Sequence, residues 1–172
     1  MQQQWISRVI SVCLAMSLLS SVYAADQVTD KQPEMIKMHA ALTQSAEVGH
    51  KVNPKTPKES SGRAMVRYFP STGELKFFLF YRKLSGRATM IHFHLGNFGK
   101  NGPKIAILCG AEKNAILKRC PRHVNAFVGT VWEVPQQYRQ AVMNNGVYIN
   151  IYTALNPKGE IRGQVLLKKA KK

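Results

Sequence analysis

The sequence predicts an all-β protein, an antiparallel Greek-key sandwich or barrel of about eight strands with one short helix. Short segments that alternate apolar and polar residues recur along the chain, as expected of strands with one buried face. Turn residues, mainly Gly, Pro, Asn and Ser, separate these segments at regular intervals. Only residues 135–143 carry the start and stop signals of a helix.

The first half of the domain is predicted to contain four strands. A Pro-, Lys- and Ser-rich loop over residues 48–61 follows the first strand, since its prolines exclude a central strand. A Pro-Ser-Thr-Gly turn over 70–73 joins the next two strands, and Leu84-Ser85-Gly86 interrupts the chain before the fourth. The four strands are 36–43, 63–69, 74–82 and 88–95.

The second half combines short strands with the helix. A glycine-rich loop over 96–103 is followed by a short strand, and residues 109–125 are expected to be irregular or briefly helical. The helix begins at Pro135 and stops before Asn145-Gly146. An Asn-Pro-Lys-Gly turn over 156–159 joins the last two strands. The strands of this half are 105–108, 127–132, 147–153 and 160–167.

The N-terminus has the parts of a secretory signal peptide: Arg8, an apolar run to Val22, and small residues at Ala24-Ala25. The run is short for a membrane span, although an uncleaved anchor is the alternative, and no later segment is long and apolar enough to span a bilayer. We therefore expect a secreted or periplasmic protein. The expected organisation is a signal peptide at 1–24, a flexible segment at 25–34, one domain at 35–167 and a basic tail at 168–172.

The chain is strongly basic, with a formal net charge of +16. Such a charge attracts polyanions, for example an anionic glycan or lipopolysaccharide. The basic residues are scattered and form no nucleic-acid-binding motif, so no specific nucleic-acid binding is expected. The alternative is that the charge serves only solubility. The sequence gives no indication of the oligomeric state.

Two cysteines, Cys109 and Cys120, remain after the predicted signal peptide is removed. An even number of cysteines in an exported chain favours a disulfide. The alternative, a metal site, fits poorly because this spacing matches no common zinc pattern.

Alternation places a polar set of side chains on one face of three strands, opposite the apolar core set. His92 and His94 point the same way and are close enough to share one metal ion, so copper or zinc binding is one interpretation. A third ligand would have to be His39, His50, His123 or Glu160, of which we favour His123. The alternative is that both histidines hydrogen-bond to neighbouring groups. The remaining members of the polar face are Asn150, Tyr152, Glu160 and Arg162.

No arrangement of residues indicates catalysis. The chain lacks a Gly-x-Ser-x-Gly motif, a phosphate-binding loop and a dinucleotide fingerprint. Glu160 and Arg162 share a face, and a structural ion pair is favoured over an anion-binding arginine oriented by the acid.

Three blocks of the sequence resemble the chordin domain (CHRD) family. The blocks are the segment 36–64, the segment 84–103 with Ile91-His92-Phe93-His94, and the segment 146–165 with Asn156-Pro157-Lys158-Gly159-Glu160. The resemblance implies an extracytoplasmic all-β domain and brings no catalytic residues. It implies that the recurrent polar positions are His92, His94, Asn150, Glu160 and Arg162.

The sequence departs from the family in two places. Tyr152 stands where the family often has a histidine, and residues 109–121 replace a stretch that is usually glycine-rich. The segment around His92 and His94 also resembles the first copper-ligand strand of copper/zinc superoxide dismutases, but the remaining ligands of those enzymes are absent. We therefore predict a binding module that requires no cofactor and engages a protein or a polyanion. The alternative is a periplasmic copper- or zinc-binding protein.

Overall fold

The computed structural model describes residues 34–121, 127–128 and 132–168. The predicted signal peptide, His123 and the basic tail beyond Lys168 lie outside the described residues. Within the described ranges, no helix has the length and apolar character that a membrane span requires.

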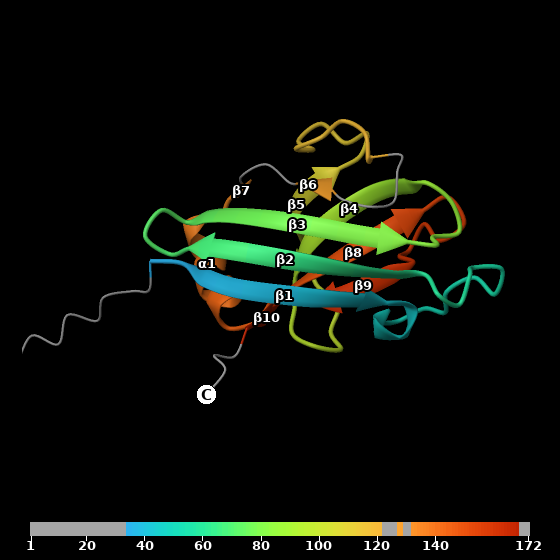
Figure 1. Ribbon diagram of the computed structural model, residues 1–172, viewed down its shortest axis with the longest axis horizontal. Helices are drawn as coiled ribbons and strands as arrows, with labels where there is room; N and C mark the ends of the chain where they lie inside the picture. Colours follow the sequence, from blue (N-terminus) through green and yellow to red (C-terminus); the bar gives the residue numbers. More distant parts are fainter. Residues whose placement is uncertain (1–33, 122–126, 129–131, 169–172) are drawn as a thin grey trace, which may run out of the picture. The chain divides into compact units, whose positions relative to one another are not determined.

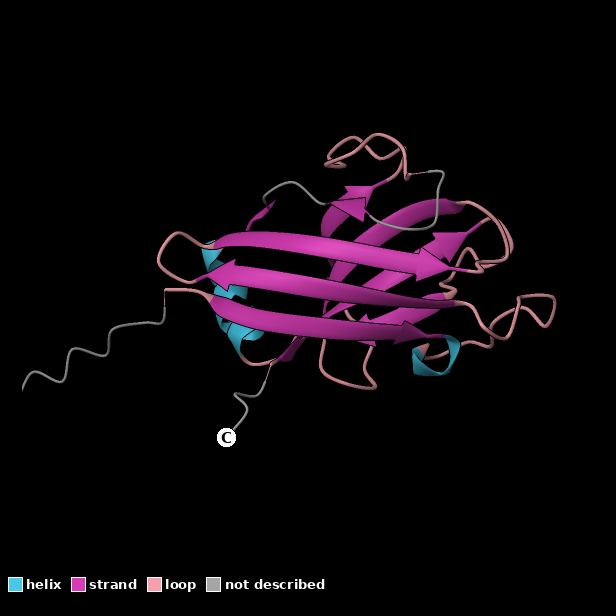
Figure 2. Ribbon diagram, viewed as in Figure 1, coloured by secondary structure: helices cyan, strands magenta, loops and turns pink. Residues whose placement is uncertain are grey.

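The described residues form an antiparallel sheet that curls into a half-barrel (Figures 1 and 2). Eight strands follow one another in the order β5-β4-β8-β9-β1-β2-β3-β6, while β10 pairs with β1 and β7 pairs with β3. The strands are β1 Ile36–Thr43, β2 Ser61–Phe69, β3 Glu74–Arg82, β4 Ala88–Leu95, β5 Lys104–Cys109, β6 Phe127–Val128, β7 Trp132–Glu133, β8 Val147–Thr153, β9 Ile161–Gln164 and β10 Leu166–Leu167. The helices are the 3-10 turn η1 Gln44–Ala46 and α1 Gln136–Met143.

The all-β prediction is confirmed, and β3, β4 and β8 begin and end at the predicted residues. The strand predicted over 160–167 is instead divided. β9 lies between β8 and β1 and pairs with both, whereas β10 pairs with β1 alone. Leu167 lies opposite the buried Met38 of β1, but it is 38% exposed and does not belong to the core. The strand predicted over 127–132 is likewise observed as two short strands, β6 and β7.

The core lies inside the curl of the sheet. Strands β1, β2 and β3 bury every second side chain, so that one face of each strand is apolar and the other is exposed. The ring of Phe77 on β3 meets that of Phe93 on β4 edge-on at 5.7 Å, and Trp132 stacks on Phe93. The helix α1 contributes the buried Val142 to this core.

Strands β8 and β9 are buried on both faces. Their apolar side chains point into the core, and their polar side chains contact residues of the loops at 44–60 and 96–103. In Figure 1, β1, β2 and β3 form the near layer, and β4, β8 and β9 lie behind them. The polar face predicted from the sequence is therefore an internal surface.

Candidate functional site

The structure brings the predicted polar residues together because β4, β8 and β9 are neighbours in the sheet. In the strand register, His94 pairs with Tyr148, and Asn150 lies between His92 on one side and Arg162 on the other. These residues and Tyr152 share the covered face. His39 does not join them, because it points outward from β1 and is exposed.

Both ring nitrogens of His94 have partners. Nδ1–H donates to the carbonyl oxygen of Gly102 at 3.0 Å, and Nε2 accepts from the hydroxyl of Tyr152 at 2.8 Å. The ring also stacks on Tyr148, with 4.9 Å between the centroids. Burial lowers the pKa of His94 below its ordinary value, so the imidazole is neutral at physiological pH.

His92 is buried beside the loop that Cys109 and Cys120 close. Its Nε2 lies 3.0 Å from Oε1 of Glu112, but without the geometry of a hydrogen bond. Burial lowers the pKa of His92 to about 4, against the opposing effect of Glu112, and Glu112 also pairs with Lys104. The predicted disulfide is present, and it holds the segment that carries Glu112. No signal in the sequence could have identified Glu112, since it lies in irregular structure.

This geometry does not assemble the predicted metal ligands. The rings of His92 and His94 are 5.7 Å apart, but the Nε2 of His94 is occupied by Tyr152. His50 instead donates to the carbonyl oxygen of Gly159 at 3.0 Å. Nowhere in the described part of the chain do three or more His, Cys, Asp or Glu side chains converge as metal ligands would. The favoured third ligand, His123, lies outside the described residues.

Arg162 holds the loop at 96–103 against the sheet. Its guanidinium donates to the side-chain oxygen of Asn101 at 2.7 Å and to the carbonyl oxygen of Lys100 at 2.6 Å. It also lies over the ring of Tyr148, with Cζ 3.5 Å from the centroid. With only 2% of Arg162 exposed, the charge is not presented to a soluble anion.

Glu160 does not pair with Arg162, contrary to the favoured ion pair. Its carboxylate accepts from the backbone N–H of Ser85 at 2.7 Å, and from Thr153 at 2.6 Å and Asn156 at 2.8 Å. The hydroxyl of Ser85 also donates to it. These bonds tie the turn before β9 to the break before β4, so Glu160 stabilises the chain path.

Glu47 is a buried acid that the sequence analysis did not single out. Its side chain is 2% exposed, and its carboxylate accepts from Nδ2 of Asn150 at 3.3 Å. The Oε1 of Glu47 and the Oδ1 of Asn150 are buried without a hydrogen-bond partner. Burial raises the pKa of Glu47 to about 7, although His50, Asn150 and Arg162 oppose the increase.

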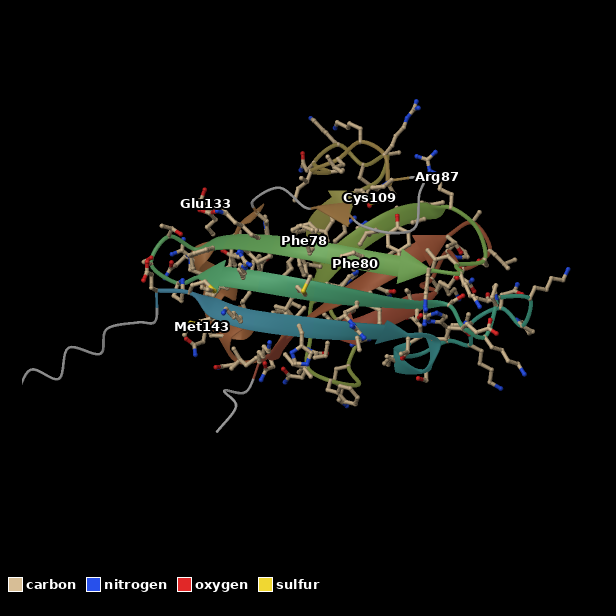
Figure 3. The ribbon with its side chains drawn as sticks, in the orientation of Figure 1. Phe78, Phe80, Arg87, Cys109, Glu133 and Met143 are labelled. Carbon is tan, nitrogen blue, oxygen red and sulfur yellow. A yellow bond between two sulfur atoms is a disulfide. The ribbon has the colours of Figure 1, made fainter. Side chains whose placement is uncertain are left out.

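One accessible surface is the outer face, which we define as the side chains of β1, β2 and β3 that point away from the core. The register arranges them in rows across the three strands. The rows are Lys37–Arg67–Lys76, His39–Met65–Phe78, Ala41–Arg63–Phe80 and Thr43–Ser61–Arg82. Figure 3 shows Phe78 and Phe80 along β3.

A groove of about 660 Å³ lies at one end of the outer face. The small side chains of Ala41 and Ser61 line it together with the larger Arg63, Phe80 and Arg82. The guanidinium of Arg82 donates to Ser61 at 3.3 Å, while no acidic side chain in the described ranges forms an ion pair with Arg63 or Arg82. The groove therefore offers two arginines and an aromatic ring to a ligand.

The comparison with protein families identifies the chain. Residues 38–165 match the family model described as CHRD domain. The chain therefore belongs to the CHRD domain family, as the resemblance predicted. No curated protein and no solved structure matches the chain.

Proposed function

We propose that this CHRD domain is an exported binding module, without catalytic activity, that engages a polyanionic partner through its outer face. The groove lined by Arg63 and Arg82, on the same face as the row of Lys37, Arg67 and Lys76, is the observation that carries the proposal. An anionic glycan or lipopolysaccharide is the proposed class of partner, and the proposed location is the periplasm or the cell exterior. No cofactor is required for this role.

The charge on the outer face supports the proposal. Five basic side chains point outward from the three strands, and the only acid on these strands, Glu74, pairs with Lys76 at 2.7 Å. The other four have no acidic partner within ion-pair distance among the described residues. They are Lys37, Arg63, Arg67 and Arg82. A cluster of unpaired like charges is stabilised when an anion binds, so this face favours a polyanionic ligand.

The test measures binding to a sulfated polysaccharide at increasing salt concentration. We expect Arg63→Gln/Arg82→Gln to weaken binding roughly tenfold, since each lost charge contact is worth about 0.5–1 kcal/mol. The matched control is Lys113→Gln/Arg119→Gln, which removes the same charge from the exposed loop after β5. Equal weakening by both pairs would show that net charge alone attracts the ligand, and would overturn the assignment to the outer face.

A further inference from the structure

An apolar row, interrupted by His39, crosses the middle of the outer face and continues onto the neighbouring strand β10. The large exposed side chains in this row are Met65 (52% exposed), Phe78 (41%) and Leu166 (40%). The register aligns them across four strands, because His39 on β1 pairs with Met65 on one side and with Leu166 on the other. Met65 in turn pairs with Phe78. Three of the five exposed large apolar side chains of the described residues are therefore in one line.

Basic side chains border the apolar row on both sides. On one side is the row of Lys37, Arg67 and Lys76, which Lys168 extends through a backbone bond to Lys37 at 2.9 Å. On the other side are Arg63 and, one row further, Arg82. Adjacent rows are about 7 Å apart, since they are separated by two residues of a strand.

We infer that the outer face docks on the surface of a bilayer that contains anionic lipids, an inference that rests on the proposed function. A soluble polyanion would use the basic rows but would leave the apolar row in water. At a bilayer surface the apolar row enters the boundary between headgroups and acyl chains, while the basic rows meet the lipid phosphates. Each lysine or arginine near an anionic surface contributes about 1 kcal/mol.

The shape of the outer face favours a bilayer over a single bound lipid. The groove lies at the end near Ala41, Ser61 and Arg82. Of the apolar row only Met65 reaches its lining, and Phe78 and Leu166 lie outside it. The apolar row is therefore an exposed line along a sheet surface and not a channel for an acyl chain. A line of exposed side chains of this kind makes more contact with the surface of a bilayer than with a single lipid molecule.

The experiment measures binding of the full mature chain to phosphatidylglycerol vesicles, to phosphatidylcholine vesicles and to a soluble sulfated polysaccharide. We expect binding to phosphatidylglycerol and little binding to phosphatidylcholine. Phe78→Ser/Leu166→Ser removes two exposed members of the apolar row that do not line the groove. It should weaken binding to phosphatidylglycerol at least tenfold and change binding to the polysaccharide less than about twofold. The matched control is Phe98→Ser, because Phe98 is 80% exposed but lies in the loop after β4. Unfolding curves verify that the variants remain folded.

The outcomes separate the inference from the proposed function. Binding to the polysaccharide without binding to vesicles would overturn the bilayer inference and leave the proposed function in place. Vesicle binding that Phe78→Ser/Leu166→Ser leaves unchanged, or that Phe98→Ser weakens equally, would also overturn it. The absence of binding to any anionic ligand would overturn both.

Discussion

The hydroxyl of Tyr152 lies 2.8 Å from Nε2 of His94 and occupies the nitrogen that a metal ion would need. We expect Tyr152→Phe to release this nitrogen and to increase the affinity for copper or zinc in a calorimetric titration. Loss of the hydrogen bond should lower the free energy of unfolding by about 1 kcal/mol. Tight metal binding by the wild type that is lost in His92→Ala/His94→Ala would contradict this prediction and favour the metal-binding interpretation.

The disulfide between Cys109 and Cys120 is predicted to keep His92 buried. Replacing both cysteines with alanine should lower the free energy of unfolding by about 2–3 kcal/mol, because the closed loop is short. The loop carrying Glu112 should then move away, and the pKa of His92 should rise from about 4 toward its ordinary value. An NMR titration of the histidine ring measures this shift. An unchanged pKa would show that the sheet and its other neighbours keep His92 buried without the disulfide.

The sequence predicted the strands well because their alternation is local information. It also placed His92, His94, Asn150 and Arg162 on one face, since side-chain direction follows from strand position. It could not predict that loops cover this face. The partners of the polar residues come from irregular segments, as with Asn101 for Arg162 and Gly102 for His94. The same limit explains why Glu47, at the start of a long loop, was missed.

The rows on the outer face could not be predicted from the sequence either. Each strand shows its own exposed residues, but a row requires the register between strands. The pairing of Met65 with Phe78 is fixed by the tight turn between β2 and β3, and its pairing with His39 by the alternating buried residues of β1 and β2. The scattered basic residues of the sequence thus come together on one face, on both sides of the apolar row, only in the folded sheet.

Gly159 is predicted to be required for the buried position of the Glu47 carboxylate. Its φ of 126° is rarely adopted by residues with a side chain, and an added Cβ would lie 2.7 Å from Oε2 of Glu47 and from Nδ2 of Asn150. Gly159→Ala should therefore lower the free energy of unfolding by about 2–3 kcal/mol in chemical denaturation. The control is Gly86→Ala, where an added Cβ meets no atom within 4 Å. Similar losses in both variants would contradict a specific role for Gly159.

Glu160 is predicted to be a structural acid. Each donor around it, from Ser85, Thr153 and Asn156, requires an acceptor, so the amide of Glu160→Gln would place N–H groups against these donors. We expect a loss of about 2–3 kcal/mol in the free energy of unfolding. Glu74→Gln, which removes only the surface pair with Lys76, should cost less than about 1 kcal/mol. A Glu160→Gln variant as stable as the wild type would refute the assignment.

The buried carboxyl of Glu47 is predicted to make stability depend on pH. Its pKa is about 7 in the folded chain, mainly because of burial, whereas the ordinary value is 4.5. Between these values the folded state keeps a proton that the unfolded state has lost. The contribution of Glu47 to the free energy of unfolding is therefore complete below pH 4.5, and it is lost as the pH rises through 7. It amounts to about 3 kcal/mol.

His92 acts in the opposite direction. Burial lowers its pKa from 6.5 to about 4, so its stabilisation is present above pH 6.5 and is lost on acidification. In the wild type, the pH dependences of the free energy of unfolding that arise from Glu47 and His92 partly cancel. Glu47→Gln should therefore reveal the pH dependence that arises from His92. Unfolding curves across this range should show the wild type gaining about 3 kcal/mol over Glu47→Gln as the pH falls from about 8 to 4.5. The exposed Glu59 of the same loop is the control, and Glu59→Gln should have a small effect at every pH. A constant difference between wild type and Glu47→Gln would mean that Glu47 stays ionised in the folded chain.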